Sequence, residues 1–123
     1  MDQLESMENH KTTAQHYCNN ANKLMEAGEI QKASELYWGF IAQEILAFAA
    51  TKERNLGTHR QFVEFCTDLS KATEDPYFKD EFKALYNALH VDFYHLMYEM
   101  SEISDFAIRA RHFVERLWSL EEK

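Results

Sequence analysis

Residues 84–100 read ALYNALHVDFYHLMYEM, and this segment points directly to the fold class. Its apolar residues recur at steps of three and four, the spacing of one buried face of an α-helix. The same face continues in both directions along the chain and comprises Phe78, Phe82, Leu85, Leu89, Phe93, Leu96, Met100 and Ile103. Because such a face is buried by packing helix on helix, we predict an all-α fold.

The composition indicates one domain over residues 1–123. Apolar residues make up 46% of the chain, and only three glycines and one proline interrupt it, so long helices with few turns are expected. Gly28, a Thr58/Gln61 capping box and Asp75-Pro76 mark helix ends. We predict an up-down bundle of about five helices: 8–27, 29–54, 58–73, a long fourth helix from Asp75-Pro76, and a last helix after a break at 101–104, with residues 1–7 frayed.

Charge and cysteine content limit the function classes. The net charge of −8 repels polyanions and argues against a general DNA or RNA coat. Cys18 and Cys66 do not form a metal-type pair, so we expect two buried, reduced thiols. The N-terminus lacks a signal-peptide pattern, and the most apolar run, 37–50, is shorter than the roughly 20 residues that span a bilayer. These features predict a cytoplasmic protein without a membrane partner.

Several polar groups interrupt the apolar helices. Asp92 and His95 share one helix face and are weak candidates for metal ligands, although a solvated acidic face is the simpler interpretation. His90 aligns with Tyr94 four residues later, which suggests either a structural hydrogen bond or a functional pair. Glu44 lies within an apolar helix, where burial would raise its proton affinity and suit it to general-base chemistry or to an ion pair.

A basic stripe runs along the last predicted helix and consists of Arg109, His112 and Arg116. It could contact phosphate, but ion pairing with a neighbouring acidic helix or plain solvation is the favoured interpretation. The sequence contains no phosphate-binding glycine loop, paired-cysteine zinc motif or serine-nucleophile elbow. We therefore predict no cofactor.

The chain resembles the archaeal PaREP family from about Ala14 to Leu117. The resemblance is carried by Gly28-Glu29-Ile30-Gln31-Lys32-Ala33-Ser34-Glu35, Trp38-Gly39, His59-Arg60 and Leu89-His90-Val91-Asp92-Phe93-Tyr94. That family is similar to the HEPN superfamily of small helical bundles. The resemblance implies an up-down bundle, frequent dimerisation, and roles in RNA cleavage or nucleotide-associated modules.

The ribonuclease pattern of the HEPN superfamily is an arginine followed, after four to six residues, by a histidine. At His90 the upstream candidates are Leu85, Ala84 and Lys83, so lysine would have to replace the bidentate arginine. Arg54 and His59 match the spacing, but they flank a glycine-containing break rather than lying on the long helix.

Three hypotheses follow from these residues. The first is a non-catalytic, HEPN-like binding module, a homodimer associated with a nucleotide or RNA. Its polar pocket would consist of Trp38, Glu44, His59, Arg60, His90 and Tyr94. The second is a metal-independent endoribonuclease with His59 or His90 as the acid-base group and Arg54, Arg60 or Lys83 holding phosphate. The third is a structural adaptor that joins a protein partner through helix packing.

Overall fold

The computed structural model describes residues 3–91 and 99–122 and contains five α-helices. They are α1 (Gln3–Glu26), α2 (Ile30–Thr51), α3 (His59–Thr73), α4 (Tyr77–Tyr86) and α5 (Met100–Ser119). A π-helical segment, η1 (Asn87–Val91), continues α4, and a 3₁₀ turn, η3 (Leu120–Glu122), follows α5. The prediction of an all-α bundle of about five helices is confirmed.

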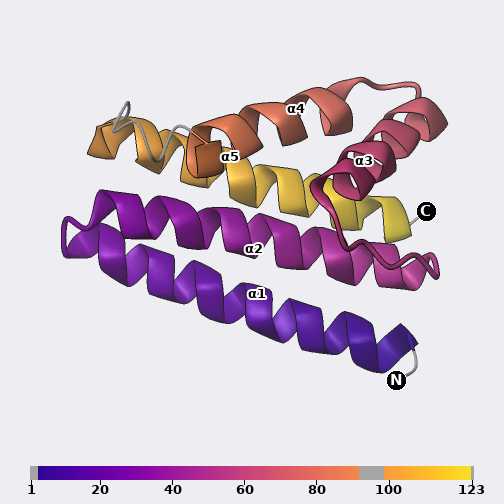
Figure 1. The fold of residues 1–123 in the computed structure, drawn as a ribbon, viewed down its shortest axis with the longest axis horizontal. Helices are drawn as coiled ribbons and strands as arrows, with labels where there is room; N and C mark the ends of the chain where they lie inside the picture. The colour runs from indigo at the N-terminus through magenta and orange to yellow at the C-terminus, as the bar shows by residue number, and fades with distance from the viewer. Residues whose placement is uncertain (1–2, 92–98, 123) are drawn as a thin grey trace.

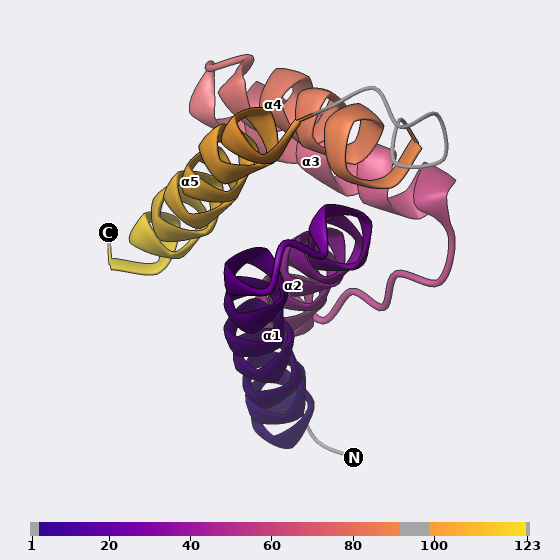
Figure 2. The same cartoon turned by 90° about the vertical axis from the view of Figure 1, so that its left-hand side faces the viewer.

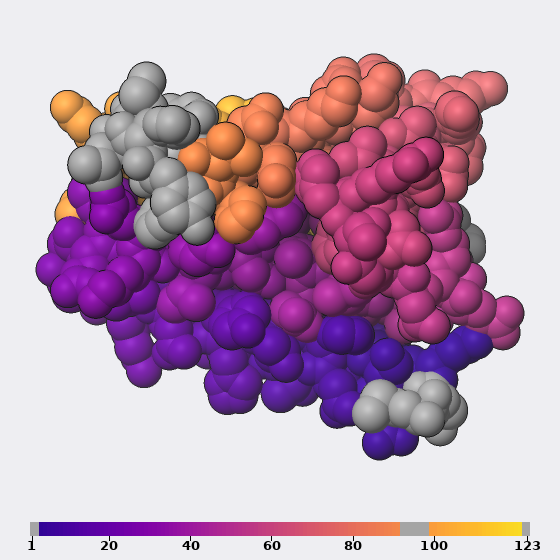
Figure 3. Space-filling view, in the orientation of Figure 1, coloured from indigo at the N-terminus to yellow at the C-terminus, as the bar shows by residue number. Residues whose placement is uncertain are grey.

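The helices form two packed groups. Helices α1 and α2 make an antiparallel hairpin, and α5 runs alongside α2, so both termini lie at the same end of the molecule (Figure 1). Figure 2 shows the α1–α2 pair on one side and α3, α4 and α5 together on the other. In the space-filling view, α1 forms the lower edge and α3 and α4 the upper right surface (Figure 3). Helix α2, which contacts α1, α5 and η1, is the central element.

Three helix ends follow the local chemistry that the sequence predicts. Gly28 has φ +77°, and the Glu29 N–H reaches back to the Leu24 carbonyl, so a left-handed glycine closes α1. The Thr58 side chain and Gln61 form the predicted capping box of α3. The Asp75 carboxylate accepts a hydrogen bond from the Tyr77 N–H at 3.0 Å, which satisfies a free amide at the start of α4.

Three predicted boundaries were wrong. Residues 101–104 belong to α5, which begins at Met100 because Glu99 and Glu102 form a reciprocal capping box there. Helix α1 already begins at Gln3, before the predicted start at Glu8. Helix α2 ends at Thr51 rather than near Arg54, because Glu53 has φ +59° and leaves the helical conformation.

The core is centred on α2 and is completed by the inward faces of α1, α3, α4 and α5. The predicted apolar face is buried at Phe78, Phe82, Leu85, Leu89 and Ile103, whereas Phe93 and Leu96 lie outside the described residues. The prediction was wrong for Met100, the first residue of α5, which is exposed. Both cysteines are free and buried, and burial raises the pKa of the Cys66 thiol to about 12. None of the helices in the described part of the chain combines the length and the hydropathy needed to cross a membrane.

Candidate aromatic binding site

A π turn at the end of α4 shapes the site. In an α-helix, with 3.6 residues per turn, a residue four positions further along has rotated slightly past the starting face. A π-helical turn contains more residues, so a step of four there rotates the chain by slightly less than a full turn and compensates for that drift. Phe82, Tyr86 and His90, spaced by four, therefore stay on one side of the α4–η1 segment. The Ser34 hydroxyl of α2 donates a hydrogen bond to the Leu89 carbonyl at 2.8 Å, which ties η1 to α2 in the interior.

Glu35 and His90, the residues that follow Ser34 and Leu89, form a second contact between α2 and η1. Glu35 Oε2 lies 3.2 Å from Nδ1 of His90, and both side chains are partly exposed, at 41% and 31%. A carboxylate beside one ring nitrogen of an imidazole orients the ring and selects the tautomer. Ser34 and Glu35 thus hold Leu89 and His90 in register with α2.

Trp38 lies one helical turn after Glu35 and packs against the α4–η1 face. Its ring centroid is 5.8 Å from that of His90, with an interplanar angle of 27°, so the two rings are stacked. Tyr86 meets Trp38 edge-on at 5.1 Å, and Phe82 lies 5.7 Å away. The stacked geometry of Trp38 with His90 and the edge-on geometry of Trp38 with Tyr86 are both favoured for aromatic pairs.

His59 joins these rings from α3. It is the first residue of the helix, immediately after the Thr58 cap, and it stacks on Tyr86 at 4.0 Å and 26°. Tyr86 also contacts His90, at 5.4 Å, so one tyrosine ring connects the two histidines. We call the set Trp38, His59, Phe82, Tyr86 and His90 the aromatic cluster.

The aromatic cluster extends from the protein interior to the solvent-exposed surface. Phe82 is buried, Trp38, Tyr86 and His90 are half-buried, and His59 is exposed. Rings held by a buried neighbour lose little conformational freedom when a planar ligand stacks on them. The cluster can therefore bind flat π-systems, and its imidazoles and Glu35 can add hydrogen bonds at the edge.

Glu44, a predicted member of the pocket, lies elsewhere. Glu44 comes six positions after Trp38 on α2. Six positions are about one and two-thirds helical turns, so the two side chains lie on different faces and Glu44 faces away from the cluster. It is 7% exposed, and burial raises the pKa of its carboxyl group. The charge of Lys11 on α1 and the indole of Trp118 on α5 partly offset that effect.

Two of the three predicted phosphate-binding cations are engaged by carboxylates. Arg54 pairs with Asp68 at 3.0 Å and lies over the Phe65 ring, and Arg60 pairs with Glu64 one turn along α3. The Lys83 side chain is exposed on α4. Arg54 lies in the loop between α2 and α3, beyond the end of α2, and does not share a helix with His59.

Asp92, Tyr94 and His95 lie outside the described residues. Across residues 3–91 and 99–122, no three histidine, cysteine, aspartate or glutamate side chains lie close enough together to hold a metal ion.

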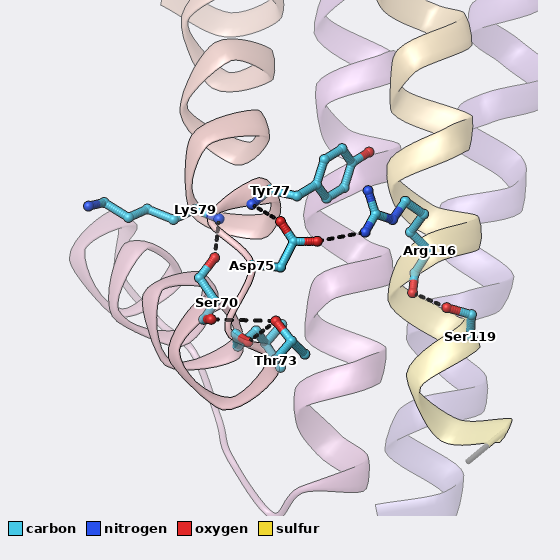
Figure 4. Close-up of polar contacts among 8 residues, drawn as sticks. Ser70, Thr73, Asp75, Tyr77, Lys79, Arg116 and Ser119 are labelled. Carbon is cyan, nitrogen blue, oxygen red and sulfur yellow. Dashed lines mark hydrogen bonds and ion pairs between the residues drawn. The ribbon is translucent and has the colours of Figure 1, made fainter.

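Two members of the predicted basic stripe of α5, Arg109 and Arg116, pair with acidic residues of α4 and of the turn before it, as one of the two favoured interpretations predicts. The third member, His112, is exposed and meets the Tyr77 ring edge-on. Arg109 donates to both carboxylate oxygens of Glu81, and Arg116 donates to Asp75 at 2.8 Å. Figure 4 shows Asp75 between the Tyr77 backbone N–H and the Arg116 guanidinium. These two donors lower the pKa of Asp75. The stripe therefore fastens α5 to α4 and is not a free phosphate site.

Sequence reasoning identified Trp38, His59 and His90 but missed Glu35, Phe82 and Tyr86. Two signals could have found them. Glu35 and Trp38 are three apart, and the ring side chains at 82, 86 and 90 recur every four residues, so each set shares a helix face.

Comparison with known proteins gives one match. The model of the archaeal PaREP1/PaREP8 family matches residues 9–114 of the chain. No curated protein and no solved structure matches the chain.

Proposed function

The chain belongs to the archaeal PaREP1/PaREP8 family, and we propose that it is a non-catalytic helical module that binds a nucleobase by stacking on the aromatic cluster. The base would belong to a nucleotide or to unpaired RNA. The HEPN-like relationship of the bundle is part of this proposal.

The observation that carries the proposal is the convergence of Trp38, His59 and Tyr86 from three different helices. The His59–Tyr86 stack and the Trp38–His90 stack leave partly exposed rings on one surface. Stacking on aromatic rings is the main way in which proteins hold unpaired bases, and it contributes about 1–3 kcal/mol per base.

The charge distribution favours recognition of the base rather than the phosphate. The chain carries a net charge of −8. Arg54 and Arg60 are each engaged by a carboxylate, as are Arg109 and Arg116 of α5. Electrostatic attraction to a polyanion is therefore weak, and the binding energy must come from the rings.

Metal-independent ribonuclease activity is the second candidate. Glu35 orients His90 as an acid-base group would be oriented, and His59 contacts the same tyrosine ring. Cleavage would require a cation at the phosphate, and both predicted arginines are paired with carboxylates, so the exposed Lys83, which lacks the bidentate geometry of arginine, would have to serve. Binding without turnover therefore has the stronger support.

Homodimer formation and a cytoplasmic location complete the proposal. Met100 and Ile108 on α5 are large apolar side chains with exposures of 41% and 58%, which supports an apolar contact with a second copy. Sedimentation of the chain and of Ile108→Lys tests this part. A dimer that becomes monomeric in the variant would support it, and a wild-type monomer at all concentrations would exclude it.

The proposal is tested by fluorescence anisotropy with a labelled single-stranded RNA hexamer of mixed sequence. We expect the wild-type chain to bind, and Tyr86→Leu to weaken binding roughly ten-fold, because one stacked base contributes 1–3 kcal/mol. Phe106→Leu, which changes a half-buried ring on α5 outside the cluster, is the matched control.

Gel analysis of the same RNA separates the two candidates. Intact RNA after incubation supports a binding module. If the wild-type chain cleaves the RNA and either His59→Ala or His90→Ala abolishes the cleavage, the binding-module proposal is rejected in favour of the ribonuclease. Equal affinity for Tyr86→Leu and the wild type would reject the aromatic cluster as the site.

A further inference from the structure

Glu35 gives the rim of the aromatic cluster a directional acceptor. One oxygen, Oε2, lies against Nδ1 of His90. Within the described residues, 3–91 and 99–122, the other oxygen, Oε1, accepts no hydrogen bond. The Glu35 side chain is 41% exposed. The carboxylate therefore lies beside the stacked Trp38 and His90 rings with acceptor capacity left over.

The edges of the four RNA bases differ in what they offer such a group. Guanine presents two adjacent donors on its Watson–Crick edge, the N1–H and the N2 amino group. Adenine and cytosine each place one amino donor next to a ring-nitrogen acceptor, and uracil places one N–H between two carbonyl acceptors. An ionised carboxylate only accepts hydrogen bonds, and two parallel donors suit it best.

We propose that Glu35 makes the aromatic cluster selective for guanine. The inference rests on the proposed function, because the rings must first hold a base by stacking. Glu35 then accepts hydrogen bonds from N1–H and the N2 amino group of the stacked guanine, while the acceptor atoms of the other bases face a negative charge.

Electrostatics and position agree with this assignment. The carboxylate repels phosphate, so it suits the neutral base edge and not the backbone of the ligand. Its link to His90, together with the Ser34–Leu89 hydrogen bond one residue earlier, fixes the distance between the acceptor and the ring stack. A preorganised acceptor discriminates more strongly than a mobile one, since an analogue without the donors leaves it unpaired.

The test is a ligand-observed NMR titration of the full chain with the 5′-monophosphates of guanosine, inosine, adenosine, cytidine and uridine. All five carry the same phosphate, and inosine differs from guanosine only in lacking the N2 amino group. We expect guanosine monophosphate to bind roughly ten-fold more tightly than the adenosine, cytidine and uridine monophosphates, with inosine monophosphate in between.

Two variants assign the preference to Glu35. Glu35→Gln keeps an oxygen that can accept from His90 but replaces the second acceptor by an amide donor, so it should lose the guanosine preference and retain adenosine binding. Glu115→Gln, which changes an exposed carboxylate on α5 outside the cluster, is the control and should behave as the wild type.

Each outcome is decisive. Equal binding of all five nucleotides, or a guanosine preference that persists in Glu35→Gln, would overturn the assignment of Glu35 and leave the stacking site in place. Absence of binding by any nucleotide, together with absence of RNA binding, would instead reject the proposed function itself.

Discussion

Ser34 and Leu89 are 55 residues apart in sequence, yet the Ser34 hydroxyl donates to the Leu89 carbonyl at 2.8 Å in the interior. Ser34 is 2% exposed, so this hydrogen bond is shielded from water. It joins the central helix α2 to the π-helical segment that carries His90. One buried hydroxyl therefore sets the position of the ring stack on which the proposed function depends.

Replacing Ser34 by alanine should destabilise the fold. The variant leaves the Leu89 carbonyl without its side-chain partner, and an unsatisfied buried polar group costs about 1–3 kcal/mol. Urea unfolding followed by circular dichroism measures the loss. Ser101→Ala, at an exposed position of α5, is the control and should change the free energy of unfolding by less than about 0.5 kcal/mol. Equal stability of the two variants would mean that the hydrogen bond contributes nothing.

Gly39 permits the close approach of α1 and α2. A Cβ atom at this position would lie 2.8 Å from Cδ2 of Tyr17, inside contact distance. Gly39→Ala gains about 1 kcal/mol of helix propensity but should lose about 1–3 kcal/mol through overpacking, so we expect net destabilisation in urea unfolding.

Removing the Tyr17 ring should reverse the sign of that effect. In a Tyr17→Ala background, Gly39→Ala no longer meets the ring and should stabilise the chain by up to about 1 kcal/mol. Stabilisation by Gly39→Ala in the wild-type background would contradict the close approach.

Glu44 should make the stability of the chain depend on pH. Burial raises the pKa of its carboxyl group in the folded state. The folded state tolerates the protonated carboxyl group of Glu44 better than the charged one, so this contribution to stability is fully present below the unfolded pKa of about 4.3. It is lost as the pH rises through the folded pKa, because the buried group then becomes charged. Glu44→Gln should therefore be more stable than the wild type at pH 7, and the difference should disappear below about pH 4.

Urea unfolding at pH 7 and at pH 4 measures this difference. Glu115→Gln, on the exposed side of α5, is the matched control and should change the free energy of unfolding by less than about 0.5 kcal/mol at both pH values. A Glu44→Gln variant that is less stable than the wild type at pH 7 would show that the charged carboxylate is net stabilising.

The two cysteines should react only when the chain unfolds. Both are buried, and burial raises the pKa of both thiols, to about 12 for Cys66. Little thiolate is then available to attack an alkylating reagent. Iodoacetamide labelling at pH 8, analysed by intact-mass measurement, should be slow in buffer and rapid in concentrated urea. Rapid labelling of either cysteine in buffer would place that thiol in an open region.

The sequence predicts the helices well because their signals are local. The spacing of apolar residues, Gly28, the Thr58/Gln61 capping box and Asp75 each act within one or two turns. The start of α5 was misplaced although its signal, Glu99 with Glu102, is equally local. In that case residues 101–104 were interpreted as a break, whereas they lie inside the first turns of a capped helix.

The site was harder to predict because it depends on packing between distant segments. Trp38, His59 and His90 were identified individually, but nothing local states that Tyr86 connects them or that a π turn keeps His90 on the same face. Glu44 was placed in the pocket on chemical grounds, whereas its position along α2 directs it towards Lys11 and Trp118. Helix periodicity identifies shared faces, but the partner of each face is set by the tertiary arrangement.

The most direct test of base stacking uses the indole N–H signals of the two tryptophans in a nitrogen-15 correlation spectrum. Trp38 belongs to the aromatic cluster, whereas Trp118 packs against Phe48 at 5.3 Å and lies under Lys11, so it serves as an internal control. When a single-stranded RNA hexamer or guanosine monophosphate is added, we expect the Trp38 signal to shift progressively to saturation while the Trp118 signal stays in place. An unchanged Trp38 signal at saturating ligand, or equal shifts of both signals, would contradict binding at the aromatic cluster.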